Sequence, residues 1–316
     1  MAELRPPLVV VAGATASGKT ALAIDLAERL AAEGVSAEII SADSRQVYRG
    51  MDIGTAKATA AERARVPHHG LDLVDPDQPF SVSDFADHVG PVLAQLAENG
   101  GVAILAGGTG FYLRAIARGL AVDELPYDAE VRASIELALT ANGLPALVAE
   151  MRSLAPTRAA EIDLHNPRRV VRALEIARIR GDVPLPQPRG YGQPVLWLGL
   201  AVESSVLRER IRARARGQFE AGLIEETRAL IARFDATQFS FTGIGYAEAR
   251  AVIDGRLSYE DAIAEDATRN IRFARRQDTW FRREPDIRWL SATSRIPTAE
   301  ALELVHEYLA DARPPA

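Results

Sequence analysis

The feature that most constrains the fold is the segment Gly13–Thr20, which reads Gly-Ala-Thr-Ala-Ser-Gly-Lys-Thr and fits G-x-x-x-x-G-K-[ST] at every fixed position. A short apolar, β-branched run, Leu8–Ala12, precedes it, and Thr20–Leu30 after it has helical Ala/Leu spacing. In such a strand–loop–helix unit, glycines let backbone N–H groups turn toward phosphate oxygens, and the helix adds the positive end of its dipole. The segment therefore predicts a phosphate-binding loop (P-loop).

Within this loop, Lys19 would supply a positive charge and the Thr20 hydroxyl would bind Mg²⁺. The residues expected to hold the phosphate groups are Gly13, Ala14, Thr15, Ala16, Ser17, Gly18, Lys19 and Thr20. The commonest occupants of such loops are ATP and GTP. However, the strand-like run Val102–Ala106 is followed by Gly107 and not by the Asp that usually helps to hold magnesium. The loop alone leaves the phosphate compound open.

Further strand-like runs alternate with helical sequence, which indicates an α/β fold with a P-loop NTPase-like parallel sheet and flanking helices. They are Glu38–Ser41, Val102–Ala106 and Val195–Val202. Ligands of parallel sheets bind at the carboxyl ends of the strands. The loops at Gly13, Asp43 and Thr109 should therefore converge on one crevice.

Two side chains at these strand ends are candidates for chemistry. Asp43 is placed to act as a general base, although Asp-Ser is also a common turn pair. Thr109 follows two glycines and could donate its hydroxyl to a reacting atom, but from the residues alone the role of a turn residue is favoured. For Asp43 the residues alone do not decide between the two roles.

Residues 124–190 read as a helical insertion in the α/β core, which then comprises 1–123 and 191–316. Three helical segments follow one another here without a strand: Val131–Leu139, Leu147–Leu154 and Val170–Ile179. From Val206 onward the sequence predicts Arg-rich amphipathic helices.

Composition narrows the functional class. The net charge of −6 does not fit a globally basic nucleic-acid binder, although arginines cluster locally around Arg168–Arg180 and Arg269–Arg283. Without cysteine there is no disulfide or thiol chemistry, and without a long apolar run or leader-like segment we expect a cytoplasmic protein that does not enter a membrane. The pair His68-His69 is interpreted as structural rather than metal-binding, and Trp280 and Phe281 as core rather than base-stacking residues.

Taken in order, these segments resemble the tRNA dimethylallyltransferases, also called tRNA isopentenyltransferases. The resemblance rests on Gly13–Thr20, Asp43-Ser-Arg-Gln-Val-Tyr48, Gly50-Met-Asp-Ile-Gly-Thr-Ala-Lys57, Pro67-His-His69 with Asp72, Phe80-Ser-Val-Ser-Asp-Phe85, Gly107-Gly-Thr-Gly-Phe-Tyr112, Asn166-Pro-Arg-Arg169 with Arg172-Ala-Leu-Glu175, Ile244-Gly-Tyr246 and Arg275-Arg-Gln-Asp-Thr-Trp280.

The resemblance implies transfer of a dimethylallyl group from dimethylallyl diphosphate to N6 of an adenine beside the anticodon of tRNA. The P-loop would then hold the diphosphate of the donor with Mg²⁺, and Lys19, Asp43 and Thr109 would act in catalysis. It further implies that the anticodon stem-loop contacts Asp43, Ser44, Arg45, Gln46, Thr109, Arg132, Arg168, Arg169, Val170, Val171, Arg172 and Gln277.

Three alternatives stay open beside this reading. One is an enzyme that prenylates free adenine nucleotides, although the helical insertion argues against it. Another is a P-loop small-molecule kinase, and the third is an RNA-binding or switch protein whose loop binds nucleotide without chemistry. For the first reading we expect a monomer that takes tRNA and dimethylallyl diphosphate as substrates.

Overall fold

The structure is a computed structural model that describes residues 5–312. The chain forms two compact units, one made of its parts up to Gly119 and from Gly190, and one made of Leu120–Arg189. The sequence placed these boundaries at 124 and 190. The earlier start adds the short 3₁₀ turn Val122–Glu124 to the smaller unit.

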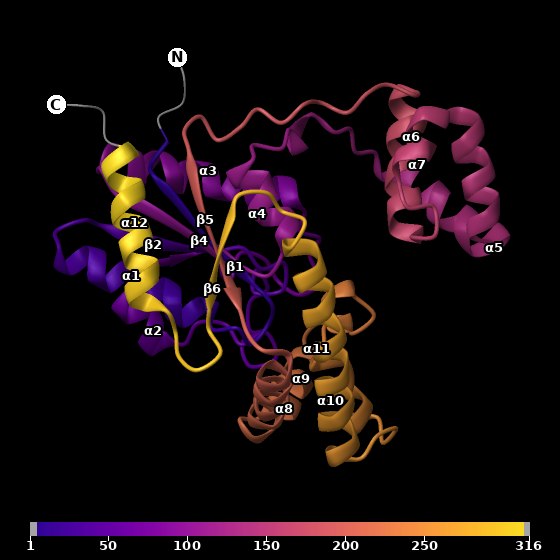
Figure 1. The fold of residues 1–316 in the computed structure, drawn as a ribbon. Helices are drawn as coiled ribbons and strands as arrows, with labels where there is room; N and C mark the ends of the chain where they lie inside the picture. Colours follow the sequence, from indigo (N-terminus) through magenta and orange to yellow (C-terminus); the bar gives the residue numbers. More distant parts are fainter. Residues whose placement is uncertain (1–4, 313–316) are drawn as a thin grey trace. The chain divides into compact units, whose positions relative to one another are not determined.

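Within the described residues, the larger unit is built on a six-stranded sheet in which every strand pairs in parallel (Figure 1). The strand order is β3-β2-β4-β1-β5-β6. The strands are β1 (Leu8–Gly13), β2 (Ala37–Ser41), β3 (His68–His69), β4 (Val102–Gly107), β5 (Val195–Ala201) and β6 (Ile287–Ser291). The predicted α/β class and the four predicted strands are confirmed.

Helices bury both faces of this sheet. Val9 and Val11 of β1 face a core shared with α1 (Lys19–Ala32) and α12 (Thr298–Ala312). Leu8 and Val10 face the opposite core, which packs on α3 (Val82–Glu98), α4 (Gly110–Ala117) and the end of α11 (Tyr259–Phe281). A strand buried on both faces reads as a continuous apolar run, which is why β1 was recognisable.

A third apolar core lies under the loop after β2, where Val47 and Met51 pack against helices from the C-terminal part of the chain. These elements are α8 (Ser204–Glu220), α9 (Leu223–Ile231), the 3₁₀ turn Phe239–Thr242, α10 (Tyr246–Ile253) and the first part of α11. The short helix α2 (Ala60–Arg65) follows the same loop and begins with a capping box between Thr59 and Glu62.

The smaller unit is helical and has its own core, formed around Leu147, Met151 and Leu174. Its helices are α5 (Ala129–Leu154), α6 (Pro156–Glu161) and α7 (Pro167–Arg180). Helix α5 is interrupted at Gly143, where φ is 76° and Pro145 follows two residues later. The break accounts for the two separate helical segments in the sequence.

One expectation for the C-terminal part was wrong. The sequence predicted only helices after Val206, but Ile287–Ser291 forms the edge strand β6. Only Leu290 of its five residues is buried, so the strand lacks the apolar run that marks the central strands. None of the helices between residues 5 and 312 is both long and apolar enough to cross a bilayer.

Candidate active site

The P-loop leaves β1 at Gly13 and enters α1 at Lys19. Three of its residues have positive φ: Gly13 (150°), Ala16 (62°) and Gly18 (99°). A glycine tolerates such angles without a steric penalty, and they turn the intervening N–H groups toward one point. The ammonium of Lys19 donates to the carbonyl of Ala14 at 2.8 Å, so it lies across the same loop.

The charge on Lys19 is weakened by its surroundings. Burial lowers the pKa of its ammonium to about 8; the nearby Arg214 guanidinium contributes to the decrease and the Asp43 carboxylate opposes it. Burial also lowers the pKa of Arg214, against the attraction of Asp43 and Asp266. Two neighbouring cations that share the carboxylate of Asp43 leave an excess of positive charge. The site therefore favours the binding of a polyanion.

The sequence analysis missed Arg214. Its guanidinium donates to the Thr15 hydroxyl of the P-loop at 3.1 Å and to the Thr55 carbonyl at 3.5 Å. Ile211, Ala215 and Gln218 mark the buried face of α8, and Arg214 lies next to that face. This spacing was the available signal, but it was obscured because α8 carries arginine on its exposed face as well.

Asp43 and Thr109 come together as predicted, since the loops after β2 and β4 are bonded to one another. The Thr109 amide donates to the carbonyl of Ala42 at 3.2 Å, and the Ser44 amide donates to Oγ1 of Thr109 at 3.1 Å. Oδ1 of Asp43 accepts from the Arg45 amide at 2.8 Å, which leaves its other oxygen for a second partner. A polar pair at two adjacent strand ends can orient and deprotonate an amine.

Arg45 and Gln46, which follow in the same loop, contact different parts of the molecule. Arg45 donates to the carbonyls of Phe239 and Ser240 at 2.9 and 3.2 Å, and its guanidinium lies 4.2 Å from the centre of the Phe239 ring. The Gln46 amide bonds Ser41 and the Thr55 and Ala56 carbonyls. Gln46 therefore ties the loop after β2 to the same Thr55 carbonyl that Arg214 binds.

The structure places Gln277, a predicted RNA contact, in the interior of the larger unit. Its side chain is 6% exposed and lies between two loops of the site. Oε1 accepts from the Thr15 amide at 2.8 Å, and Nε2 donates to the Gly108 carbonyl at 2.9 Å. A buried amide with these bonds does not present a surface to RNA.

In the helical unit, the expected RNA-contacting residues of α7 differ in exposure. Arg168 and Arg169 are exposed. The side chains of Val170 and Val171 are buried in the core of this unit, so an RNA contact at these two positions would have to involve their backbone. They fall on the inner face because successive helical residues are about 100° apart.

Two further expected RNA contacts of this unit are already engaged in ion pairs. Arg132 and Arg172 both bind Oε2 of the fully buried Glu175, at 2.9 and 2.7 Å. A buried carboxylate needs such partners, so the two arginines contribute to the stability of the unit.

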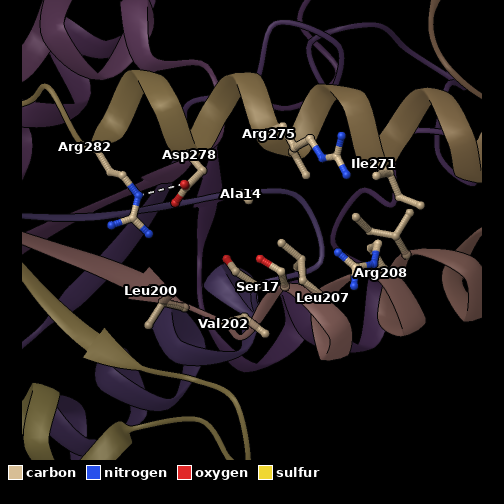
Figure 2. A pocket seen from close by; sticks show the side chains of 13 residues that line it. Ala14, Ser17, Leu200, Val202, Leu207, Arg208, Ile271, Arg275, Asp278 and Arg282 are labelled. Carbon is tan, nitrogen blue, oxygen red and sulfur yellow. Dashed lines mark hydrogen bonds and ion pairs between the residues drawn. The ribbon is translucent and has the colours of Figure 1, made fainter.

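A cavity lies beside the P-loop (Figure 2). Its walls combine apolar side chains from β5, α8 and α11, among them Leu200, Leu207 and Ile271, with polar and charged side chains. Arg208 and Arg275 line it from the two helices, Ser17 lines it from the P-loop, and Figure 2 shows Arg282 paired with Asp278 at one end. A space lined by both apolar and cationic side chains next to a phosphate loop suits a ligand that joins a short hydrocarbon to an anion.

The residues present fit a magnesium ion only together with a bound phosphate. Thr20 is exposed in the first turn of α1. Among residues 5–312, no three His, Cys, Asp or Glu side chains are grouped so that they could hold a metal. Mg²⁺ commonly binds through one protein oxygen, phosphate oxygens and several waters, so one hydroxyl is sufficient.

Comparison with known proteins identifies the family. Residues 46–284 match the model of the IPP transferase family. A tRNA dimethylallyltransferase of Anaeromyxobacter dehalogenans (strain 2CP-C) is 45% identical over 289 residues, which cover 90% of this chain and 94% of the relative. The chain belongs to the IPP transferase family.

Other IPP transferases match along nearly the whole chain. A tRNA dimethylallyltransferase of Roseiflexus sp. (strain RS-1) is 40% identical over 96% of this chain and 99% of its own length. The crystal structure of a tRNA isopentenylpyrophosphate transferase from Bacillus halodurans superposes with a TM-score of 0.70 at 37% identity, covering 98% of this chain and 97% of that one. The chain thus has the fold of a prenyl-transferring family of transferases.

Proposed function

We propose that this chain transfers the dimethylallyl group of dimethylallyl diphosphate to N6 of an adenine next to the anticodon in tRNA. The products are N6-(dimethylallyl)adenosine and diphosphate. The observation that carries the proposal is the bonding of the Thr109 loop to the Asp43 loop, with Lys19 and Arg214 within electrostatic reach of Asp43. Asp43 can then accept a proton while the P-loop, Lys19 and Arg214 bind the anionic leaving group of the same reaction.

The reaction forms a bond between N6 and C1 of the prenyl group, and the bond from C1 to the diphosphate oxygen breaks. The electron pair of that bond leaves with the diphosphate. The P-loop amides, Lys19 and Arg214 are arranged to stabilise the charge that develops there. An ion held by Thr20 and the diphosphate would supply further positive charge.

On the acceptor side, the exocyclic amine of adenine is a poor nucleophile because its lone pair is delocalised into the ring. Asp43 accepts the N6 proton as the new bond forms, and Thr109 fixes the loop that carries Asp43. The adenine must leave its stack to reach these groups, which costs a few kcal/mol and less in a single-stranded loop. Ser44, Arg45 and the two exposed arginines of the first turn of α7, Arg168 and Arg169, are the proposed RNA contacts.

A kinase with the same loop is the competing function. The end of β4 carries Gly107, Gly108 and Thr109, without the carboxylate that helps to hold magnesium for phosphoryl transfer. Prenyl transfer breaks a bond between carbon and oxygen and transfers no phosphoryl group, so it does not need this carboxylate. We also propose that the enzyme acts in the cytoplasm as a monomer.

The test is incubation with Mg²⁺, labelled dimethylallyl diphosphate and either bulk tRNA or AMP. We expect label in tRNA, at an adenine beside the anticodon when the product is digested and analysed by mass spectrometry. Asp43→Asn should lower the rate roughly 10²–10⁴-fold with tRNA binding nearly intact. Label in AMP alone, or ATP turnover without prenyl transfer, would overturn the proposal.

A further inference from the structure

The P-loop is held from outside by two helices that meet at one residue, Thr15. Its hydroxyl accepts from Arg214 of α8 at 3.1 Å, and its backbone N–H donates to Oε1 of Gln277 of α11 at 2.8 Å. The other end of the Gln277 amide donates to the Gly108 carbonyl at 2.9 Å. One buried side chain thus joins the P-loop to the residue before Thr109.

Only a side chain with one acceptor and one donor can make both bonds. The Thr15 N–H must face an oxygen and the Gly108 carbonyl must face an N–H, which fixes the orientation of the amide. Loss of either bond would leave a backbone N–H or C=O group of the site without its partner. The bridge therefore needs a side chain that carries a donor and an acceptor, as the glutamine amide does.

The absence of a side chain at Gly108 brings the bridge close. A Cβ at this residue would lie 2.3 Å from Nε2 of Gln277 and 3.9 Å from Nζ of Lys19. The amide, the ammonium and the backbone of the loop after β4 therefore share one small space. A movement of Gln277 with α11 would therefore displace both the P-loop and the loop after β4.

We propose that Gln277 is a positioning residue that sets the gap between the donor-binding P-loop and the acceptor-binding loops at Asp43 and Thr109. The proposal rests on the proposed function, because the gap has meaning only if a donor and an acceptor occupy the two sides. Bond formation needs the reacting atoms about 3–3.5 Å apart, and a misplacement of about 1 Å can cost up to 10²-fold in rate. Gln277 itself touches neither substrate.

The experiment compares Gln277→Met with Gln218→Met in the full-length chain. Methionine keeps the shape of glutamine and removes both polar groups. Gln218 is a matched control because it is 8% exposed and its amide donates to the carbonyls of Ile53 and Gly54, farther along the loop after β2 than Asp43, and bridges neither to the P-loop nor to the loop after β4. The two variants therefore lose similar buried bonds.

For Gln277→Met we expect a single-turnover rate about 10–100-fold lower, with tRNA and donor affinities within about threefold of wild type. Gln218→Met should lose a similar amount of thermal stability and keep its rate within about threefold. A tRNA affinity that falls in step with the rate, or equal rate losses in both variants, overturns the positioning role.

A second variant, Gln277→Glu, adds a pH readout. A carboxylate would repel the Gly108 carbonyl, whereas the protonated acid can donate to it and still accept from Thr15. The rate of the variant relative to wild type should therefore rise as pH falls from 8 to 6, and a constant ratio contradicts the bridge. A wild-type chain that transfers no label to tRNA overturns both proposals, while Gln277→Met at wild-type rate overturns this one alone.

Discussion

Lys19 shows how one residue's environment sets its chemistry. Its ammonium lies in the P-loop, bonded to the Ala14 carbonyl, and burial next to Arg214 lowers its pKa to about 8. A diphosphate placed beside it would favour the charged form. Because the free enzyme loses that charge in the mildly alkaline range, donor capture is linked to pH.

We therefore expect kcat/KM for the donor to fall as pH rises through about 8, because the ammonium that binds the diphosphate is lost there. Below this pH, Lys19 stays charged and does not change kcat/KM with pH. The measurement is a profile of kcat/KM for dimethylallyl diphosphate from pH 6.5 to 9.5. Lys19→Arg serves as the control, since a guanidinium keeps its charge throughout; a shared alkaline limb in both proteins would contradict the assignment.

At the scale of single residues, the sequence predicted those site residues that belong to a local motif or follow directly after a strand. The P-loop, Asp43 and Thr109 stand at strand ends, where topology alone brings them together. The roles of Gln277 and Arg214 depend on where α11 and α8 pack against the P-loop. The spacing of apolar residues marks the buried face of each helix but not the loop that this face meets, so Arg214 was passed over and Gln277 was predicted to contact RNA.

At the scale of the element, α7 separates binding from stability along one helix. Its first turn exposes Arg169, while Val170 and Val171 are buried and Arg172 pairs with the buried Glu175. The sequence identified the helix but treated these neighbours as one RNA-contacting stretch. The inward and outward faces become distinct only when the core of this unit is known.

We expect Arg169→Gln to weaken tRNA binding and to reduce the slope of log K against log salt by about 0.7–0.9, the value for one lost phosphate contact. The measurement is a titration of tRNA binding from about 50 to 200 mM salt. Arg180→Gln at the opposite end of the same helix removes an equal charge and should leave the slope nearly unchanged. Equal slopes for wild type and Arg169→Gln would rule out the contact.

At the scale of the whole molecule, the helical unit leaves and re-enters the core at one point. The Gly190 amide donates to the carbonyl of Arg118 at 3.2 Å, and a Cβ at Gly119 would lie 2.1 Å from the carbonyl oxygen of Gly190. Each unit also has its own buried core. The ends left by removing residues 120–189 are thus already side by side.

Replacing residues 120–189 by a two-residue Gly-Ser linker should leave a core that unfolds cooperatively and binds the donor within a few-fold of the intact chain. It should bind tRNA much more weakly, because the α7 contacts are removed. Circular dichroism melting and calorimetry with a donor analogue test this. Residues 120–189 expressed alone are the complementary control; an aggregated core would show that its folding needs the helical unit.

The same junction at Gly119 and Gly190 bears on the order of folding. Leu8 of β1 pairs with Val195 of β5, a contact between distant parts of the chain, whereas the helices α5–α7 make sequence-local contacts that form faster. If the helices α5–α7 fold first, the flexible chain between β1 and β5 becomes effectively shorter. The entropic cost of pairing β1 with β5 then falls by about half a kcal/mol. A substitution in the core of the helical unit should then delay sheet completion without touching a strand, as pulsed hydrogen exchange on β5 would reveal.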